Sequence, residues 1–88
     1  MVKMFKNRSE DGRCNISGQN IKRLRLALPE TTSQRAMAYL LQLRGLDVEK
    51  NVIQRIESGE RFVTDIELKA IASFLGVSAD ELLNVNEN

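Results

Sequence analysis

The 88-residue chain contains no histidine and no tryptophan, and it has only one cysteine and one proline. Without histidine, it lacks the commonest general base, the usual partner of a serine or cysteine nucleophile, and the ligand of most zinc sites. The lone Cys14 has no partner for an intramolecular disulfide, which favours the reducing cytoplasm as its location. No apolar run approaches the roughly 20 residues that a membrane helix needs, and the N-terminal residues lack the apolar stretch of a signal peptide.

The glycines, aromatic residues and acidic residues form no motif of an active site. The five glycines are too dispersed for a phosphate-binding loop, and the three phenylalanines and one tyrosine are too dispersed for a base-stacking platform. The acidic residues stand mainly at expected helix caps and on helix faces. We therefore expect no enzyme activity, no cofactor, no metal, no small-molecule substrate and no membrane partner.

The formal net charge of +1 conceals an asymmetry along the chain. Residues 1–45 contain nine lysines and arginines against three acidic residues, whereas residues 46–88 contain four against nine. A basic half and an acidic half suit a partner that presents negative charge from one side, such as nucleic acid. An ordinary solvated surface explains the same counts, so charge leaves both interpretations open.

Signals for helix starts and ends recur at helix-length intervals from residue 16 onward, and sustained alternation of polar and apolar residues is absent. We predict an all-α fold of five short helices over residues 16–88, preceded by an N-terminal arm over residues 1–15. The expected N-caps are Ser17, Ser33, Thr64 with Glu67, and Ser78 with Glu81, the last two being capping boxes. The expected helix ends are marked by Pro29, Gly45, Gly59 and Gly76.

Apolar residues three or four positions apart are expected to form the core. Those of the first three helices are Ile21, Leu24, Leu28, Met37, Leu40, Leu41, Val48, Val52, Ile53 and Ile56. The predicted third helix, about residues 49–58, also has a polar face, which carries Glu49, Lys50, Asn51, Gln54, Arg55 and Ser58. Arginine and lysine donate to guanine, glutamine and asparagine pair with adenine, and a helix fits the major groove. A charged, solvated helix face is the alternative reading of the same residues.

Several short motifs follow one another in a fixed order between residues 17 and 84. They are IxxLR in the first predicted helix, SQ opening the second, IxxIExG ending the third, and the closing LGVSADELL. In this order and spacing the chain resembles the Cro and phage-repressor type of helix-turn-helix domain, the xenobiotic-response-element family. The resemblance implies a five-helix repressor-like fold and a sequence-specific DNA-binding transcriptional regulator of the bacterial or phage repressor type.

The resemblance also implies roles for individual residues. The helix over about residues 49–58 would be the recognition helix, and its base-reading side chains would be Lys50, Asn51, Gln54 and Arg55. Gln34 would contact phosphate and brace that helix, and Lys22 and Arg23 would add phosphate contacts. Arg25 and Glu57 would form a buried salt bridge that ties the first helix to the third.

The chain departs from the family pattern at two places. Six residues separate Leu41 from Val48, where the family usually has a tight turn with a single glycine. The second helix is therefore expected to run about a turn longer, with Gly45 to Asp47 bridging to the third. Glu49 stands where a small capping hydroxyl is usual, and its carboxylate would face phosphates unfavourably. It is expected to accept a hydrogen bond from cytosine N4 or to discriminate against wrong sites.

The N-terminal arm carries basic residues that Glu10 and Asp11 interrupt: Lys3, Lys6, Arg8 and Arg13. They could follow a phosphate strand or enter the minor groove. We favour packing on the domain, through Phe5 for example, or disorder, because the acidic residues break the basic run.

We expect the partner to be double-stranded DNA, bound by a homodimer on a palindromic site. The expected dimer seam is the fifth helix through Leu82, Leu83 and Val85, although the same leucines could instead complete the core. The alternative function is a protein-interaction module on the same fold, either a bridging factor or an antitoxin that binds a toxin. The small net charge and the longer turn leave this alternative open.

Overall fold

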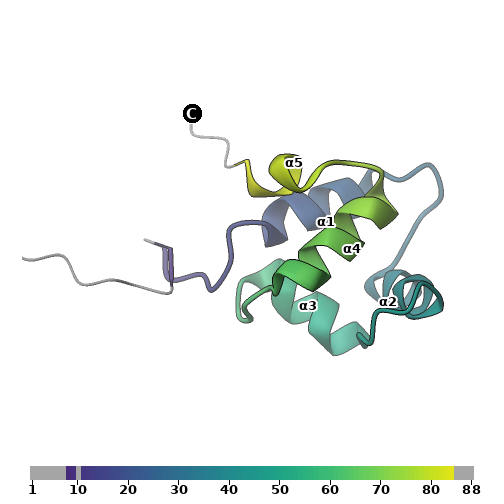
Figure 1. The fold of residues 1–88 in the computed structure, drawn as a ribbon, viewed down its shortest axis with the longest axis horizontal. Coiled ribbons are helices and arrows are strands. Elements are labelled where there is room, and N and C mark those ends of the chain that lie inside the picture. Colours follow the sequence, from purple (N-terminus) through teal and green to yellow (C-terminus); the bar gives the residue numbers. More distant parts are fainter. Residues whose placement is uncertain (1–7, 10, 85–88) are drawn as a thin grey trace, which may run out of the picture.

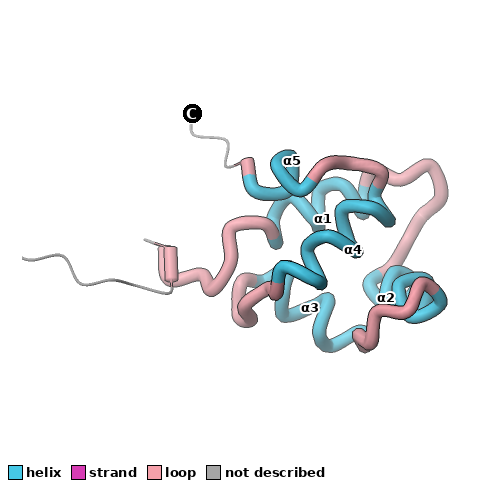
Figure 2. Tube along the Cα trace, viewed as in Figure 1, coloured by secondary structure: helices cyan, strands magenta, loops and turns pink. Residues whose placement is uncertain are grey.

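The computed structural model describes residues 8, 9 and 11–84 of the chain. These residues form five helices and no strand, connected by short loops (Figures 1 and 2). The helices are α1 (Gly18–Leu26), α2 (Gln34–Leu43), α3 (Lys50–Ser58), α4 (Asp65–Leu75) and α5 (Ala79–Leu83). The prediction of an all-α, five-helix fold is confirmed. Val85, Phe5, Glu10 and the basic residues Lys3 and Lys6 lie outside the described residues.

Three of the four expected N-caps are confirmed. The serine or threonine oxygen accepts a hydrogen bond from the backbone N–H three residues later at Ser33, Thr64 and Ser78. Ser17 behaves differently, because its side chain makes no capping bond. The N–H of Gly18 donates instead to Oδ1 of Asn15, at 2.8 Å. The expectation for Ser17 was wrong because an asparagine two residues earlier satisfies the first helical N–H in its place.

The core lies among all five helices. Its fully or nearly fully buried apolar residues are Ile21, Met37, Ala38, Leu41, Val48, Ile53, Ile56, Ile71, Ala72 and Leu82. α2 packs on α3, α1 lies against both α3 and α4, and α5 covers α1 and α4 (Figure 1). Most of the predicted core residues are therefore buried or packed against the core.

Two expectations about apolar residues need correction. Leu40 was placed in the core, yet its side chain is on the outer side of α2 and is 38% exposed, because Ala38 fills the inner face with Met37 and Leu41. Leu82 was placed at the expected dimer seam, yet it has no exposed surface and completes the core. Of the seam residues that the structure describes, only Leu83 is exposed.

Candidate nucleic-acid interface

The outer face of α3 presents polar side chains to the surroundings. Asn51, Gln54 and Arg55 are exposed, while Ile53 and Ile56 on the opposite side are fully buried. This arrangement follows from the helical period, since residues three and four apart share a face. The face offers amide and guanidinium groups of the kinds that read base edges.

Lys50 begins α3 and lies beside this face. It is half-buried, and its Nζ donates a hydrogen bond to Oε1 of Gln54 at 3.1 Å. The two residues are one helical turn apart, which is the spacing at which side chains on a helix surface meet. The contact orders two of the four expected base-reading side chains relative to one another.

An open groove of about 770 Å³ runs between α2 and the N-terminal end of α3. Its lining residues are Ser33, Arg35, Ala36, Ala38, Tyr39, Gln42, Glu49, Lys50 and Asn51. Two of the expected base-reading residues therefore border the groove, and Gln54 and Arg55 lie further along the exposed face of α3. The structure thus brings the polar face of α3 and the outer side of α2 together on one surface.

The sequence interpretation missed Arg35 and Tyr39, which line this groove from α2. Arg35 follows Gln34 at the start of α2, and Tyr39 lies one turn after Arg35 on the same side of the helix. The spacing of four indicates that the two residues share one side of α2, but the groove itself forms only where α2 and α3 meet. Arg35 adds a positive charge beside Lys50, and Tyr39 adds a largely exposed ring.

Gln34 joins the start of α2 to α3. Its side-chain Nε2 donates to Oε1 of Glu57 at 2.9 Å. The amide group has a second hydrogen that this bond does not use. The structure therefore shows a link from Gln34 to α3.

Arg25 and Glu57 form a buried ion pair between α1 and α3. Nε of Arg25 donates to Oε2 of Glu57 at 2.8 Å, and Nη2 donates to Oε1 at 2.9 Å. Nη1 donates to the carbonyl of Thr32 at 2.8 Å, in the loop before α2. The hydrogen bonds that Arg25 donates to the carboxylate of Glu57 raise the pKa of Arg25 above its usual range, although burial acts in the opposite direction. One guanidinium thus fixes α1, the loop and α3 together.

The connection between α2 and α3 has the predicted longer form. α2 continues to Leu43, and Gly45 follows with a φ of +95°, a backbone conformation that suits glycine. The N–H of Leu46 donates to the carbonyl of Leu41, and the side-chain amide of Gln42 donates to the carbonyl of Val48. These bonds hold the connection in one shape, which sets where α3 starts.

Glu49 is the N-cap residue of α3. Its backbone is extended, but in the described part of the chain its side chain makes no capping hydrogen bond. The carboxylate is exposed and lines the groove. A negative charge therefore lies at the N-terminal end of α3, beside its polar face, as the sequence implied.

Two of the three basic residues of α1 are those expected to contact phosphate. Lys22 and Arg23 are both exposed. Nη2 of Arg23 donates to Oδ1 of Asn20 at 3.2 Å, and the amide of Asn20 donates to backbone carbonyls at the C-terminal end of α5. Figure 1 shows α5 on the opposite side of α1 from α2 and α3. Arg23 therefore turns toward α5, away from the groove.

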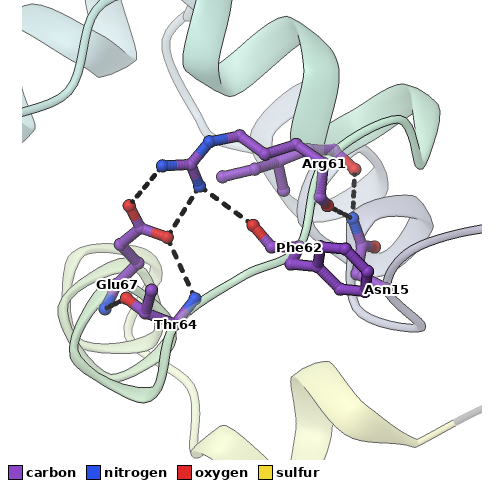
Figure 3. A network of polar contacts seen from close by, with 6 residues as sticks. Asn15, Arg61, Phe62, Thr64 and Glu67 are labelled. Atoms are coloured by element: carbon purple, nitrogen blue, oxygen red, sulfur yellow. Dashed lines mark hydrogen bonds and ion pairs between the residues drawn. The ribbon is translucent and has the colours of Figure 1, made fainter. Parts of the chain in front are cut away.

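The beginning of α4 is held by a polar network that includes Arg61, Thr64 and Glu67 (Figure 3). Nη1 and Nη2 of Arg61 donate to the two carboxylate oxygens of Glu67 at 2.8 and 2.9 Å. The same carboxylate accepts from the N–H of Thr64 at 3.0 Å, completing the capping box. These bonds, those from Arg61 foremost, hold the pKa of Glu67 below its usual 4.5.

Clusters of metal ligands and membrane-spanning helices are both absent from the part of the chain that the structure describes. Within residues 8, 9 and 11–84, no group of three or more cysteine and acidic side chains is placed to hold a metal ion. Among the five helices described, none combines the length and apolar character needed to cross a membrane.

Comparison with known proteins gives one match. The family model described as helix-turn-helix matches residues 21–82, which is most of the chain. Comparisons with curated proteins and with solved structures give no match. The matched range begins in α1 and ends in α5, so it contains the groove and the whole of α3.

Proposed function

Because the chain belongs to the helix-turn-helix family of the Cro and phage-repressor type, we propose that it is a sequence-specific transcriptional regulator of the bacterial or phage repressor type. One observation carries the proposal. Asn51, Gln54 and Arg55 form an exposed polar face on α3, next to the groove that α2 borders. A helix with such a face fits the major groove of DNA, while the preceding helix lies across the phosphate backbone.

In this proposal α3 is the recognition helix and its four polar side chains read bases. Arg55 and Lys50 suit guanine O6 and N7, whereas Asn51 and Gln54 suit adenine N6 and N7. The hydrogen bond between Lys50 and Gln54 supports a joint role, because it holds the two groups in one relative position. Glu49 adds a carboxylate beside them, which favours a cytosine N4 donor and disfavours closely placed phosphates.

Contacts with phosphate are proposed for residues in α1 and at the start of α2. Gln34 has one amide hydrogen bonded to Glu57 and a second that a phosphate oxygen can accept. Lys22 is exposed on α1, and Arg35 at the groove adds a further positive charge. Arg23 has the weakest support in this set, because it turns toward α5.

We further propose that the chain binds as a homodimer on a palindromic site. One domain of this kind covers one half-site, and two half-sites one helical turn apart match a twofold-symmetric pair. Leu82 cannot contribute to the dimer interface, because its side chain is buried in the core. Leu83, 40% exposed at the end of α5, is the described part of the expected seam that stays accessible.

A protein-interaction module is the second candidate function, and one observation favours it. Tyr39, Leu40 and Leu43 are 59%, 38% and 66% exposed on the outer side of α2. They follow the three-and-four spacing of a helix face that packs against another helix. A bridging factor or an antitoxin would use such a face to hold a partner protein.

The two functions differ in their response to salt and sequence. We would select bound sites from genomic or random DNA with the purified chain, then measure Kd for the selected duplex and for a random duplex. For a regulator, the logarithm of the association constant falls steeply and linearly with the logarithm of the salt concentration. The two duplexes also differ in Kd. DNA binding that neither weakens with salt nor differs between the two duplexes would contradict the proposed regulator. The protein-interaction module would then be the remaining candidate.

Arg55→Ala tests base reading at the selected site. We expect a loss of about 1–3 kcal/mol there, roughly a 5- to 150-fold rise in Kd, with little change on random DNA. Lys69→Ala is the matched control, because it removes the same charge from an exposed position on α4 outside the groove. Equal losses on both duplexes would show that Arg55 contacts phosphate alone.

A further inference from the structure

Residues 13–15, here called the strap, cross the C-terminal end of α3. Nη2 of Arg13 donates to the carbonyl of Glu57 at 2.8 Å, and Nη1 donates to the carbonyl of Ser58 at 3.2 Å. The N–H of Cys14 donates to the carbonyl of Gly59 at 2.8 Å. The strap therefore supplies donors to consecutive carbonyls at the end of the proposed recognition helix.

Asn15 extends the same contact to two neighbouring segments. Its Nδ2 donates to the carbonyl of Ile56 at 3.0 Å and to that of Arg61 at 2.7 Å. Its Oδ1 accepts from the N–H of Gly18, the first residue of α1. One side chain thus joins the start of α1, the end of α3 and the loop that leads to α4. Figure 3 shows its contact with Arg61.

The end of α3 has carbonyls that need donors from outside the helix. The last four carbonyls of a helix have no intrahelical donor, and a helix of nine residues is marginal without tertiary support. A guanidinium at a helix C-terminus is also favoured by the partial negative charge there. The strap meets both needs with Arg13 and Asn15.

The fit between the strap, α1 and α3 is close. A Cβ atom on Gly59 would lie 2.7 Å from Cζ of Arg13, and one on Gly18 would lie 2.1 Å from the carbonyl oxygen of Ile56. At Gly18 the near atom is backbone, so another residue would block this contact, whereas at Gly59 the φ of +85° is what favours glycine. The strap and α1 therefore hold the end of α3 at a defined position.

We propose that the strap is a positioning element of the DNA-reading surface, an inference that rests on the proposed function. Arg13 and Asn15 fix the last turn of α3, and through it the positions of Gln54 and Arg55. The guanidinium of Arg13 and the amide of Asn15 donate to carbonyls at the end of α3, so the effect is exerted through the helix. Base reading tolerates displacements of only about 0.5 Å, whereas contacts with phosphate depend mainly on charge.

The strap has a different role from a DNA-tracking arm. Both terminal nitrogens of Arg13 are bonded to carbonyls of α3. A phosphate could be bound only through the N–H groups that these two bonds leave over, with the guanidinium held against α3. Loss of Arg13 should therefore lower the discrimination between DNA sequences and leave the number of phosphate contacts unchanged.

The test compares Arg13→Met with Arg8→Met. Both changes remove one positive charge from the N-terminal segment, but Arg8 is exposed and only Arg13 is bonded to α3 among the bonds described. We would measure Kd for the selected and the random duplex over a series of salt concentrations, at a temperature where circular dichroism shows each variant to be folded. Amide hydrogen exchange of each variant would report the last turn of α3 directly.

For Arg13→Met we expect the ratio of random to selected Kd to fall about fivefold or more, with an unchanged salt slope. Hydrogen exchange should accelerate in the last turn of α3. Arg13→Lys should restore part of the ratio, because an ammonium group can donate to one of the carbonyls. Arg8→Met should leave the ratio as it is in the unmodified chain.

Two results would overturn the inference. An unchanged ratio for Arg13→Met would show that the strap does not position the reading surface. A salt slope reduced by about one, with equal losses on both duplexes, would identify Arg13 as a phosphate contact. If the unmodified chain itself selects no site, the proposed function fails, and hydrogen exchange still tests the hold of the strap on α3.

Discussion

The substitution Arg25→Ala probes how α1 holds the proposed recognition helix. It removes a guanidinium that makes two bonds to Glu57, at 2.8 and 2.9 Å, and a third to the carbonyl of Thr32. Arg25 is 6% exposed and Glu57 is 5% exposed, so water has little access to replace these bonds. The carboxylate of Glu57 would keep only the bond from Gln34 among its side-chain partners in the described structure.

The expected cost is large because a buried charge is left without its counter-charge. Removing one partner of a buried pair typically costs about 3–5 kcal/mol. Replacing both partners, as in Arg25→Met with Glu57→Leu, removes the charge as well as its partner and should cost much less. The double-mutant cycle isolates the coupling between the two side chains.

Urea unfolding followed by circular dichroism measures these differences. With a urea dependence of about 1–3 kcal/mol per molar, a loss of about 3 kcal/mol lowers the midpoint by about 1 M or more. Arg23→Ala on the same helix is the control, because an exposed substitution should change stability by no more than about 0.5 kcal/mol. An unfolding midpoint for Arg25→Ala equal to that of the control would refute the reasoning.

Three further predictions test other parts of the fold. Gly18→Ala should destabilise the chain by about 1–3 kcal/mol in urea unfolding, despite the better helix propensity of alanine, because its Cβ would meet the carbonyl of Ile56 at 2.1 Å. Ser33→Ala should cost about 1 kcal/mol in the same assay, through loss of the α2 cap, and no change would argue against that cap. The third concerns pH: since the pKa of Glu67 is lower in the folded chain than its usual 4.5, the stability that it contributes is complete above that value and is lost as pH falls through the folded pKa. Stability should therefore fall more steeply with acid in the unmodified chain than in Glu67→Gln, and parallel pH curves would contradict this assignment.

Local features of the fold follow closely from the sequence. The caps at Ser33, Thr64 and Ser78 were predictable because each bond joins residues three positions apart. The outer face of α3 was predictable for a similar reason, since the helical period alone separates Ile53 and Ile56 from the polar residues. The buried pair of Arg25 and Glu57 was implied by family resemblance, and its three-dimensional contact required the packing of α1 on α3.

Features that depend on distant segments were not predictable in the same way. Periodicity placed Leu40 in the core and left Leu82 open as a seam residue, but only the arrangement of neighbouring helices decides which apolar side chains are covered. Arg35 and Tyr39 likewise acquire a place in the groove only when α2 and α3 meet.

The contrast is clearest at the two ends of α3. Its start and its polar face depend on neighbours in the sequence, so the order of residues was sufficient to predict them. Its C-terminal end is held by Arg13 and Asn15, whose bonds span 41 to 46 positions along the chain. No local pattern encodes a hydrogen bond over that separation, because the donor and acceptor come together only after α1 has packed against α3. The tertiary structure alone therefore decided that residues 13–15 are bonded to the end of α3.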